Sequence, residues 1–228
     1  MICDNLSAIR AAIAEAARRC SRDPDSIELV AVSKRMDRKK ILRAAECGQT
    51  VFGENYLQEA RDKIESLPPA LRWHFIGHLQ SNKAREAVRL FDLIETVDRW
   101  KLARALDRHA AQLQRCQEVL VQVNVGREPQ KSGVLPEDAE ELLRAMSGLA
   151  HLRVLGLMTM PPRAAEPQEC RPYFRELRRL GETFAARGLF ADNTRVELSM
   201  GMSADFAVAI GEGATMVRVG TAIFGRRS

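Results

Sequence analysis

The sequence of 228 residues has few aromatic side chains, no closely spaced cysteines and no long hydrophobic run. Its cysteines include no C-x-x-C pair and are scattered along the chain, at Cys3, Cys20, Cys47, Cys116 and Cys170. An odd number of scattered cysteines predicts a reducing compartment, with neither a disulfide framework nor a cysteine metal site. No stretch approaches the roughly 18 apolar residues of a membrane span, and the amino-terminal segment lacks the apolar core of a signal peptide. We therefore expect a cytoplasmic protein with no membrane partner.

The charge balance bears on whether the protein binds nucleic acid. The chain carries 35 Lys and Arg against 30 Asp and Glu, a formal net charge of +5, and a basic chain invites a nucleic-acid interpretation. The basic residues are interleaved with acidic ones, however, and aromatic residues make up only 5% of the chain. A single-strand binder needs aromatic side chains next to basic ones. We expect a solvated basic surface and no nucleic-acid partner.

What the sequence does contain is a regular alternation of strand and helix patterns. A leading helix over about residues 4–20 carries Leu6, Ile9 and Ile13 at helical spacing. Eight apolar runs follow, each predicting a strand and each followed by a helix pattern, at residues 27–33, 50–53, 73–77, 93–97, 119–125, 152–160, 195–200 and 216–220. Eight such units need about 200–250 residues as a closed parallel barrel. We expect an α/β protein with a single domain, a (β/α)8 TIM-type barrel over residues 1–228 with an additional N-terminal helix.

An open, doubly wound sheet is the alternative fold. Its dinucleotide crevice would need a glycine-rich phosphate loop directly after the first strand. No G-x-G-x-x-G follows residues 27–33, and this favours the closed barrel.

Lys34 stands where the first predicted strand ends. Side chains alternate along a strand, so Val30, Val32 and Lys34 share one face. A lysine in phase with two valines would present its amine in a pocket, where an amine can lose its proton and attack a carbonyl. The alternative is a lysine whose stem lies along the strand while its amine reaches water.

Two short turns near the carboxyl end of the chain predict a phosphate site. Residues 199–203 (Ser-Met-Gly-Met-Ser) and 220–222 (Gly-Thr-Ala) follow the last two predicted strands, and Ser203 is expected to cap the next helix. Barrels often bind phosphate there, because glycine lets the backbone approach and helix N-terminal N–H groups face the anion. The alternative is two ordinary turns with hydroxyl caps.

Arg218 and two histidines are the remaining polar candidates. Arg218 shares its strand face with Met216, and an arginine facing a barrel core needs a partner, either Glu197 or a ligand acceptor. His74 and His78 lack an acidic third ligand, so no metal is expected. We interpret His78 as a hydrogen-bond partner of a bound ring. A lysine, a phosphate turn and a polar ring pocket together suggest pyridoxal phosphate.

Several motifs resemble those of the pyridoxal phosphate homeostasis proteins, also called proline synthetase co-transcribed homologues, which are single-domain relatives of the alanine racemase barrel. The similar segments run in order from about residue 5 to the end. They are AVSK at 31–34, FGENY at 52–56, HFIGHLQSNK at 74–83, VQVN at 121–124, KSG at 131–133, GLM at 156–158, LSMGMS at 198–203 and VRVGTAIFG at 217–225. The last two are highly specific.

The resemblance implies a role for each matching residue. Lys34 would carry pyridoxal phosphate as a Schiff base, and Arg218 would lie at the pyridine nitrogen. The phosphate would lie on Ser199, Gly201, Met202, Ser203, Gly220 and Thr221, with Asn55 and His78 near the ring. The sequence departs from the family at Arg35-Met36, where threonine and lysine are usual, which leaves the role of these two positions at the pocket mouth open.

The resemblance also implies a function in intracellular vitamin B6 homeostasis and amino-acid and keto-acid balance, without efficient catalysis. An arginine keeps its proton, so the pyridine nitrogen would stay neutral and the cofactor would be a poor electron sink. Racemase relatives add a catalytic tyrosine from a second domain, which we do not expect here. The alternatives are an amino-acid racemase and a Schiff-base aldolase acting on a phosphosugar. We expect a monomer that hands its cofactor to pyridoxal phosphate-dependent apo-enzymes.

Overall fold

The computed structural model describes residues 1–225, so the last three residues of the predicted domain lie outside it. The strands are β1 (Glu28–Val32), β2 (Val51–Glu54), β3 (Arg72–Phe75), β4 (Leu93–Val97), β5 (Gln117–Gln122), β6 (Leu152–Met158), β7 (Glu197–Met202) and β8 (Met216–Val219). The helices are α1 (Ile2–Arg19), α2 (Arg38–Glu46), α3 (Leu57–Ile64), α4 (Ala84–Leu90), α5 (Trp100–Gln112), α6 (Ala139–Met146), α7 (Arg171–Ala186), α8 (Phe206–Gly211) and α9 (Thr221–Phe224). Short 3-10 turns cover Pro24–Ser26, Ser81–Lys83 and Pro167–Cys170.

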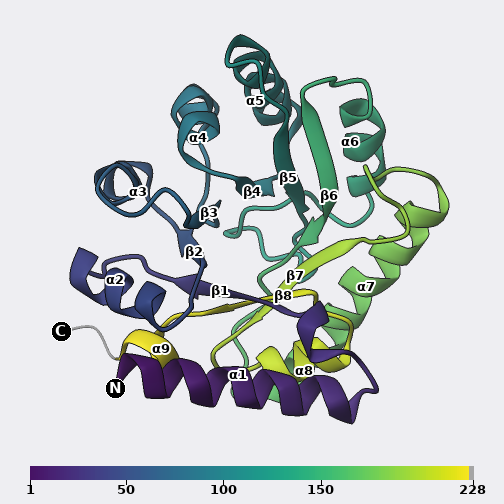
Figure 1. The fold of residues 1–228 in the computed structure, drawn as a ribbon. Helices are drawn as coiled ribbons and strands as arrows, with labels where there is room; N and C mark the ends of the chain where they lie inside the picture. The colour runs from purple at the N-terminus through teal and green to yellow at the C-terminus, as the bar shows by residue number, and fades with distance from the viewer. Residues whose placement is uncertain (226–228) are drawn as a thin grey trace.

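The strands form a closed ring in chain order, and all neighbours are parallel (Figure 1). The ring closes between β1 and β8, where Val30 pairs with Arg218 and Ala31 with Val219. Parallel neighbours need a crossover, and the helices provide it on the outside of the ring. The predicted (β/α)8 barrel is therefore confirmed.

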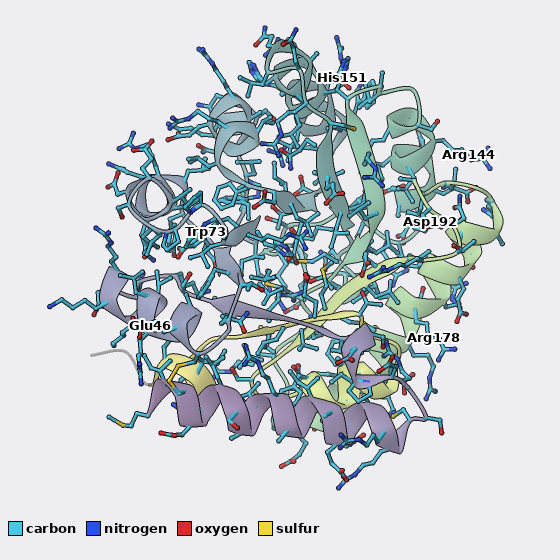
Figure 2. The ribbon with its side chains drawn as sticks, viewed as in Figure 1. Glu46, Trp73, Arg144, His151, Arg178 and Asp192 are labelled. Atoms are coloured by element: carbon cyan, nitrogen blue, oxygen red, sulfur yellow. A yellow bond between two sulfur atoms is a disulfide. The ribbon has the colours of Figure 1, made fainter. Side chains whose placement is uncertain are left out.

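Strand alternation divides the core into two layers, one inside the ring of strands and one between the strands and the helices. Figure 2 shows side chains filling the interior of the ring as well as covering the helices outside it. On β1, Val30 faces the inside of the ring, while Leu29 and Ala31 face the helices. The inner apolar layer consists of Val30, Val51, Leu93, Leu120, Met158 and Met216. The apolar side chains of the outer layer fill the space between strands and helices, and both layers are buried. Residues in phase with Val30 on β1 therefore point toward the barrel axis.

The predicted leading helix is present as α1 and lies along α8 and α9 (Figure 1). Its apolar stripe buries Leu6 and Ile13, which have 1% and 4% of their surface exposed. Asn5 Nδ2 donates a hydrogen bond of 2.9 Å to the carbonyl oxygen of Ile223. This contact fixes α1 to the short helix that follows β8. None of the helices in the described part of the chain is long and apolar enough to cross a membrane.

The segment around residues 199–205 differs from its prediction. β7 runs to Met202, whereas the apolar pattern predicts a strand that ends at residue 200. The predicted cap Ser203 is wrong, because α8 begins at Phe206 after Asp205. The Asp205 carboxylate accepts a hydrogen bond of 2.6 Å from the backbone N–H of Met202. This hydrogen bond connects the last residue of β7 to the residue that precedes α8.

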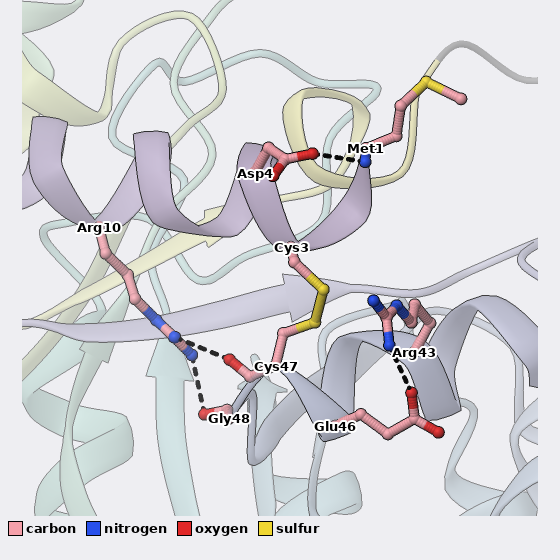
Figure 3. Close-up of a disulfide and its surroundings, with 8 residues drawn as sticks. All are labelled: Met1, Cys3, Asp4, Arg10, Arg43, Glu46, Cys47 and Gly48. Atoms are coloured by element: carbon pink, nitrogen blue, oxygen red, sulfur yellow. Dashed lines mark hydrogen bonds and ion pairs between the residues drawn. A yellow bond between two sulfur atoms is a disulfide. The ribbon is translucent and has the colours of Figure 1, made fainter.

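The sequence predicts no disulfide framework, but the structure contains a disulfide. Cys3 on α1 and Cys47 at the end of α2 form a disulfide with a Cα–Cα distance of 5.5 Å (Figure 3). The Arg10 guanidinium donates hydrogen bonds of 3.0 and 2.8 Å to the carbonyl oxygens of Cys47 and Gly48. The two cysteines are 44 residues apart in sequence, so spacing alone cannot pair them. Helix packing brings them together.

We predict that the disulfide increases stability. A cross-link between residues 44 apart restricts the unfolded chain, so Cys47→Ser should lower the free energy of unfolding by about 2–4 kcal/mol. Urea denaturation of the oxidised protein and the variant measures this, with Cys116→Ser as the control at an exposed free cysteine.

Thiol alkylation before reduction supplies the second half of this test. Cys20 and Cys116 are exposed and should react, whereas burial raises the pKa of the Cys170 thiol to about 11 and should protect it. Cys3 and Cys47 should react only after reduction. Alkylation of both before reduction of an air-oxidised sample would contradict the disulfide.

Candidate functional site

A cavity of about 150 Å3 lies at the carboxyl ends of the strands. It brings together seven of the predicted site residues, namely Lys34, Asn55, Met202, Ser203, Arg218, Gly220 and Thr221. Its other lining residues are Val32, Met36, Ile76, Met160 and Gly225. His78, Ser199 and Gly201 do not line it. Active sites of parallel barrels occupy this end of the fold, so this cavity is the candidate site.

Lys34 enters the cavity from the turn that follows β1. Its phase matches Val30 and Val32, as the sequence predicts, and Val32 lines the cavity with it. The side chain is half-buried. The next residue, Arg35, has a φ of 60°, a backbone conformation that non-glycine residues adopt at a cost. The surrounding structure must hold this turn in place.

A buried polar cluster holds the two residues that flank Lys34. The Ser33 hydroxyl donates a hydrogen bond of 2.6 Å to Glu54 Oε1, and Lys63 Nζ donates one of 2.7 Å to the Ser33 carbonyl oxygen. The backbone N–H of Arg35 donates to Glu59 Oε1 on α3. These bonds fix the backbone on both sides of the lysine. Helix α3 and strand β2 thereby fix the backbone from which the Lys34 side chain projects.

Lys63 is the central cation of that cluster. Its Nζ lies 2.7 Å from Glu54 Oε1 and 2.6 Å from Glu59 Oε1, and only 8% of Lys63 is exposed. Glu54 is fully buried. Burial raises the pKa of Glu54, while the charge and hydrogen bond of Lys63 oppose that rise. The ammonium is therefore the main stabiliser of a buried carboxylate.

The turns after β7 and β8 form another part of the cavity wall. Met202 and Ser203 contribute from the first turn, and Gly220 and Thr221 from the second. Gly201 has a φ of +91°, and a Cβ there would lie 2.6 Å from the Ala209 Cβ. Only glycine lets this turn pack against α8 while keeping a left-handed conformation. Gly201 therefore shapes the turn from outside the cavity.

Arg218 faces the cavity from β8 and is only 3% exposed. Its Nη1 donates a hydrogen bond of 2.6 Å to the Ser199 hydroxyl, and its Nη2 donates one of 2.8 Å to the Thr159 carbonyl oxygen. The nearest carboxylate is Glu95, with Oε2 3.9 Å from Nη1. The predicted partner Glu197 is wrong, because Glu197 accepts a hydrogen bond from the Thr215 hydroxyl.

The two histidines lie in different environments. His74 is fully buried inside the ring, and its Nδ1 is 2.9 Å from Glu95 Oε1. His78 is exposed, and its Nδ1 is 2.9 Å from the Ser132 hydroxyl. The two histidines therefore differ in both hydrogen-bond partner and exposure.

Asn55 is an unsatisfied polar group at the cavity. It lines the cavity, and its Oδ1 is buried without a hydrogen-bond partner among the described residues. Such a buried acceptor costs free energy unless a ligand or a water donates to it. The cavity thus offers an amine, a guanidinium, an unsatisfied amide oxygen and apolar walls. This set fits a flat, polar ring that carries an aldehyde and an anionic group.

Sequence patterns missed the carboxylates that stabilise these cations. Glu54 and Glu95 are both fully buried, each within or at the end of an otherwise apolar strand. A charged residue in a strand buried on both faces is a signal that could have found them. Lys63 lies only nine residues after Glu54, whereas Arg218 comes from a part of the chain distant from Glu95.

Comparisons with known proteins give consistent results. The model of the alanine racemase N-terminal domain family matches residues 5–228. A pyridoxal phosphate homeostasis protein of Aquifex aeolicus (strain VF5) is 42% identical over 226 residues, which cover 99% of this chain and 98% of that protein. The protein of the same name from Escherichia coli (strain K12) is 43% identical over 232 residues, covering 99% and 97%. The structure of PipY from Synechococcus elongatus PCC7942 with pyridoxal phosphate bound has a TM-score of 0.85 at 38% identity, covering 99% of this chain and all of that one.

We predict that Lys63→Met destabilises the protein by about 3–5 kcal/mol at pH 7, because it leaves the buried Glu54 carboxylate without its cation. Lowering the pH should recover part of the loss. A carboxyl whose pKa is raised in the folded state binds its proton more tightly there, so protonation stabilises the folded variant. Urea denaturation at pH 7 and pH 5 measures both effects. Lys39→Met, on the exposed side of α2, is the control, and an equal loss in the two variants would contradict the cluster's role.

Proposed function

The chain belongs to the alanine racemase N-terminal domain family and to its pyridoxal phosphate homeostasis proteins, and we propose that it binds pyridoxal 5'-phosphate and acts in vitamin B6 homeostasis. The observation that carries the proposal is the cavity in which Lys34, Arg218 and the two carboxyl-terminal turns meet. The homologue PipY was solved with this cofactor bound. The protein holds the cofactor and contributes to the balance of amino acids and keto acids.

Lys34 is the proposed attachment residue. Pyridoxal phosphate supplies an aldehyde, which an amine can hold as a Schiff base, together with an electron-withdrawing ring. Lys34 presents its amine to the cavity from a turn that Glu59 and Lys63 fix on both sides. Such fixed geometry favours the bound state, because less freedom is lost on attachment.

The turns at Ser203, Gly220 and Thr221 are the proposed phosphate site. They supply two hydroxyls, backbone N–H groups and a glycine, Gly220, whose added Cβ would crowd the carbonyl oxygen of Val32 at 3.2 Å. Arg218 is proposed to face the ring nitrogen, and the Asn55 amide to face the polar edge of the ring. Gly201 shapes the phosphate turn. Ser199 and His78 lie outside the cavity, and we propose no direct contact with the cofactor for either.

The site supports binding better than catalysis. Arg218 keeps its proton, so it donates a hydrogen bond to the ring nitrogen and cannot protonate it. The ring then withdraws electrons weakly. A two-base racemase also needs a second proton donor, and the residues described around the cavity include no tyrosine. We therefore propose a carrier or regulator and keep the amino-acid racemase as the alternative.

The wider setting is also part of the proposal. We propose that the protein works in the cytoplasm as a monomer and delivers its cofactor to pyridoxal phosphate-dependent apo-enzymes. The three free thiols, two of them exposed, suit a reducing compartment. In a reducing compartment Cys3 and Cys47 would be free thiols, and the disulfide would form on exposure to an oxidant.

We predict that the purified protein turns yellow with pyridoxal phosphate and that Lys34→Ala does not. Borohydride should fix the cofactor to Lys34, as peptide mapping by mass spectrometry would show. Lys39→Ala, at an exposed lysine on α2, is the control and should behave as the wild type. A wild type that stays colourless with pyridoxal phosphate would overturn the proposed function. A colourless protein whose Lys34 is linked by borohydride to a phosphosugar would favour the aldolase.

We also predict that the loaded protein does not exchange the α-hydrogen of alanine with deuterated water at enzyme-like rates, because the ring facing Arg218 withdraws electrons weakly. Proton NMR of alanine over several hours measures the exchange. Free pyridoxal phosphate at the same concentration gives the background rate. Sustained exchange well above that background, lost in Lys34→Ala, would establish the racemase alternative.

A further inference from the structure

A chain of buried polar groups runs through the barrel interior to Arg218. From the cavity inward, Arg218 Nη1 donates to the Ser199 hydroxyl at 2.6 Å, Ser199 donates to Glu95 Oε2 at 2.5 Å, and Glu95 Oε1 lies 2.9 Å from His74 Nδ1. These residues come from β8, β7, β4 and β3. Ser199, Glu95 and His74 are all 0% exposed. The chain therefore links strands on opposite parts of the ring without access to solvent.

The charge of Glu95 sets the direction of each bond in this chain. Burial raises the pKa of Glu95, but the hydrogen bond and charge of His74 and the charge of Arg218 outweigh it, so the net pKa is lowered. Glu95 is then a carboxylate at neutral pH and can only accept hydrogen bonds. The single Ser199 O–H must point to Glu95, which turns the oxygen lone pairs toward Arg218. His74 must carry its proton on Nδ1.

Two acceptors fix the plane of the guanidinium. Ser199 takes one N–H of Arg218, and the Thr159 carbonyl oxygen takes another from the second nitrogen. A planar group held at two nitrogens cannot rotate freely. Its remaining donors are directed by this frame toward the cavity that Arg218 lines. A buried charged network is rarely needed for stability alone, which points to a role at the site.

We propose that Glu95, held by His74 and acting through Ser199, is the positioning residue that orients Arg218 toward the ring nitrogen of the bound cofactor. The proposal rests on the proposed function and deepens it. It assigns Ser199 to the support of Arg218 and not to the phosphate site. The network thereby sets both the affinity for the cofactor and the electronic state of its ring.

Glu95→Gln tests the proposal. The amide can donate to Ser199, which releases the serine hydrogen to compete with the N–H of Arg218. We expect the dissociation constant for pyridoxal phosphate to rise roughly 10- to 100-fold, as for the loss of a hydrogen bond to a charged group. We also expect the absorption maximum of the bound cofactor to shift. Ser199→Ala should change both quantities in the same direction.

The control is Glu212→Gln. Glu212 is 6% exposed and pairs with Arg171 and Arg175 at the end of α8, away from the cavity-lining residues. Its loss should lower the melting temperature and leave the dissociation constant and the absorption maximum unchanged. A purely structural role for Glu95 would give the same result as this control.

A double-mutant cycle between Glu95→Gln and Arg218→Gln, measured by urea denaturation without cofactor, adds a readout independent of binding. Strong coupling is expected, because the two groups share Ser199. Wild-type affinity and absorption in both Glu95→Gln and Ser199→Ala would overturn the inference. If Glu95→Gln does not fold, Ser199→Ala decides alone. Failure of the wild type to bind the cofactor would instead overturn the proposed function.

Discussion

A charged side chain inside a closed ring of strands must find its counter-charge within the same ring. Arg218 is 3% exposed and projects from the inner face of β8, so it is largely shielded from water there. Glu95 supplies the negative charge, and the Ser199 hydroxyl lies between the two groups, donating to Glu95 and accepting from Arg218. Without that carboxylate the arginine would be costly to bury. This pairing matters for the candidate site, because it holds the guanidinium in the orientation in which Arg218 lines the cavity.

The two basic side chains of the cavity, Lys34 and Arg218, are supported in different ways. Arg218 is oriented from within the ring, by residues of other strands. Lys34 is oriented from outside, through the backbone on either side of it, by the cluster around Lys63. Both supports contain a fully buried glutamate bonded to a serine hydroxyl at 2.5 or 2.6 Å. The amine and the guanidinium are thus placed independently, and a change in one support need not disturb the other.

The barrel and the main site residues could be predicted because they depend on local patterns. Eight apolar runs at regular intervals give the fold, and strand alternation puts Lys34 in phase with Val30. The extension of β7 to Met202 was not predictable from apolar periodicity, since it depends on Gly201 packing against α8 and on Asp205 bonding back to the strand. The pairings of Glu95 with Ser199 and of Cys3 with Cys47 join residues 104 and 44 positions apart. Such pairs exist only after distant strands and helices have packed together.

The same network bears on the proposed balance between binding the cofactor and using it in catalysis. At its proposed position Arg218 would donate a hydrogen bond to an unprotonated ring nitrogen, and the nearby Glu95 carboxylate favours the charged form of the arginine. A protonated ring nitrogen would make the ring a stronger electron sink than this arrangement does. The buried carboxylate therefore works against strong electron withdrawal while it strengthens the hold on the ring. In the proposed complex, retention of the cofactor and weak electron withdrawal would both follow from this one interaction.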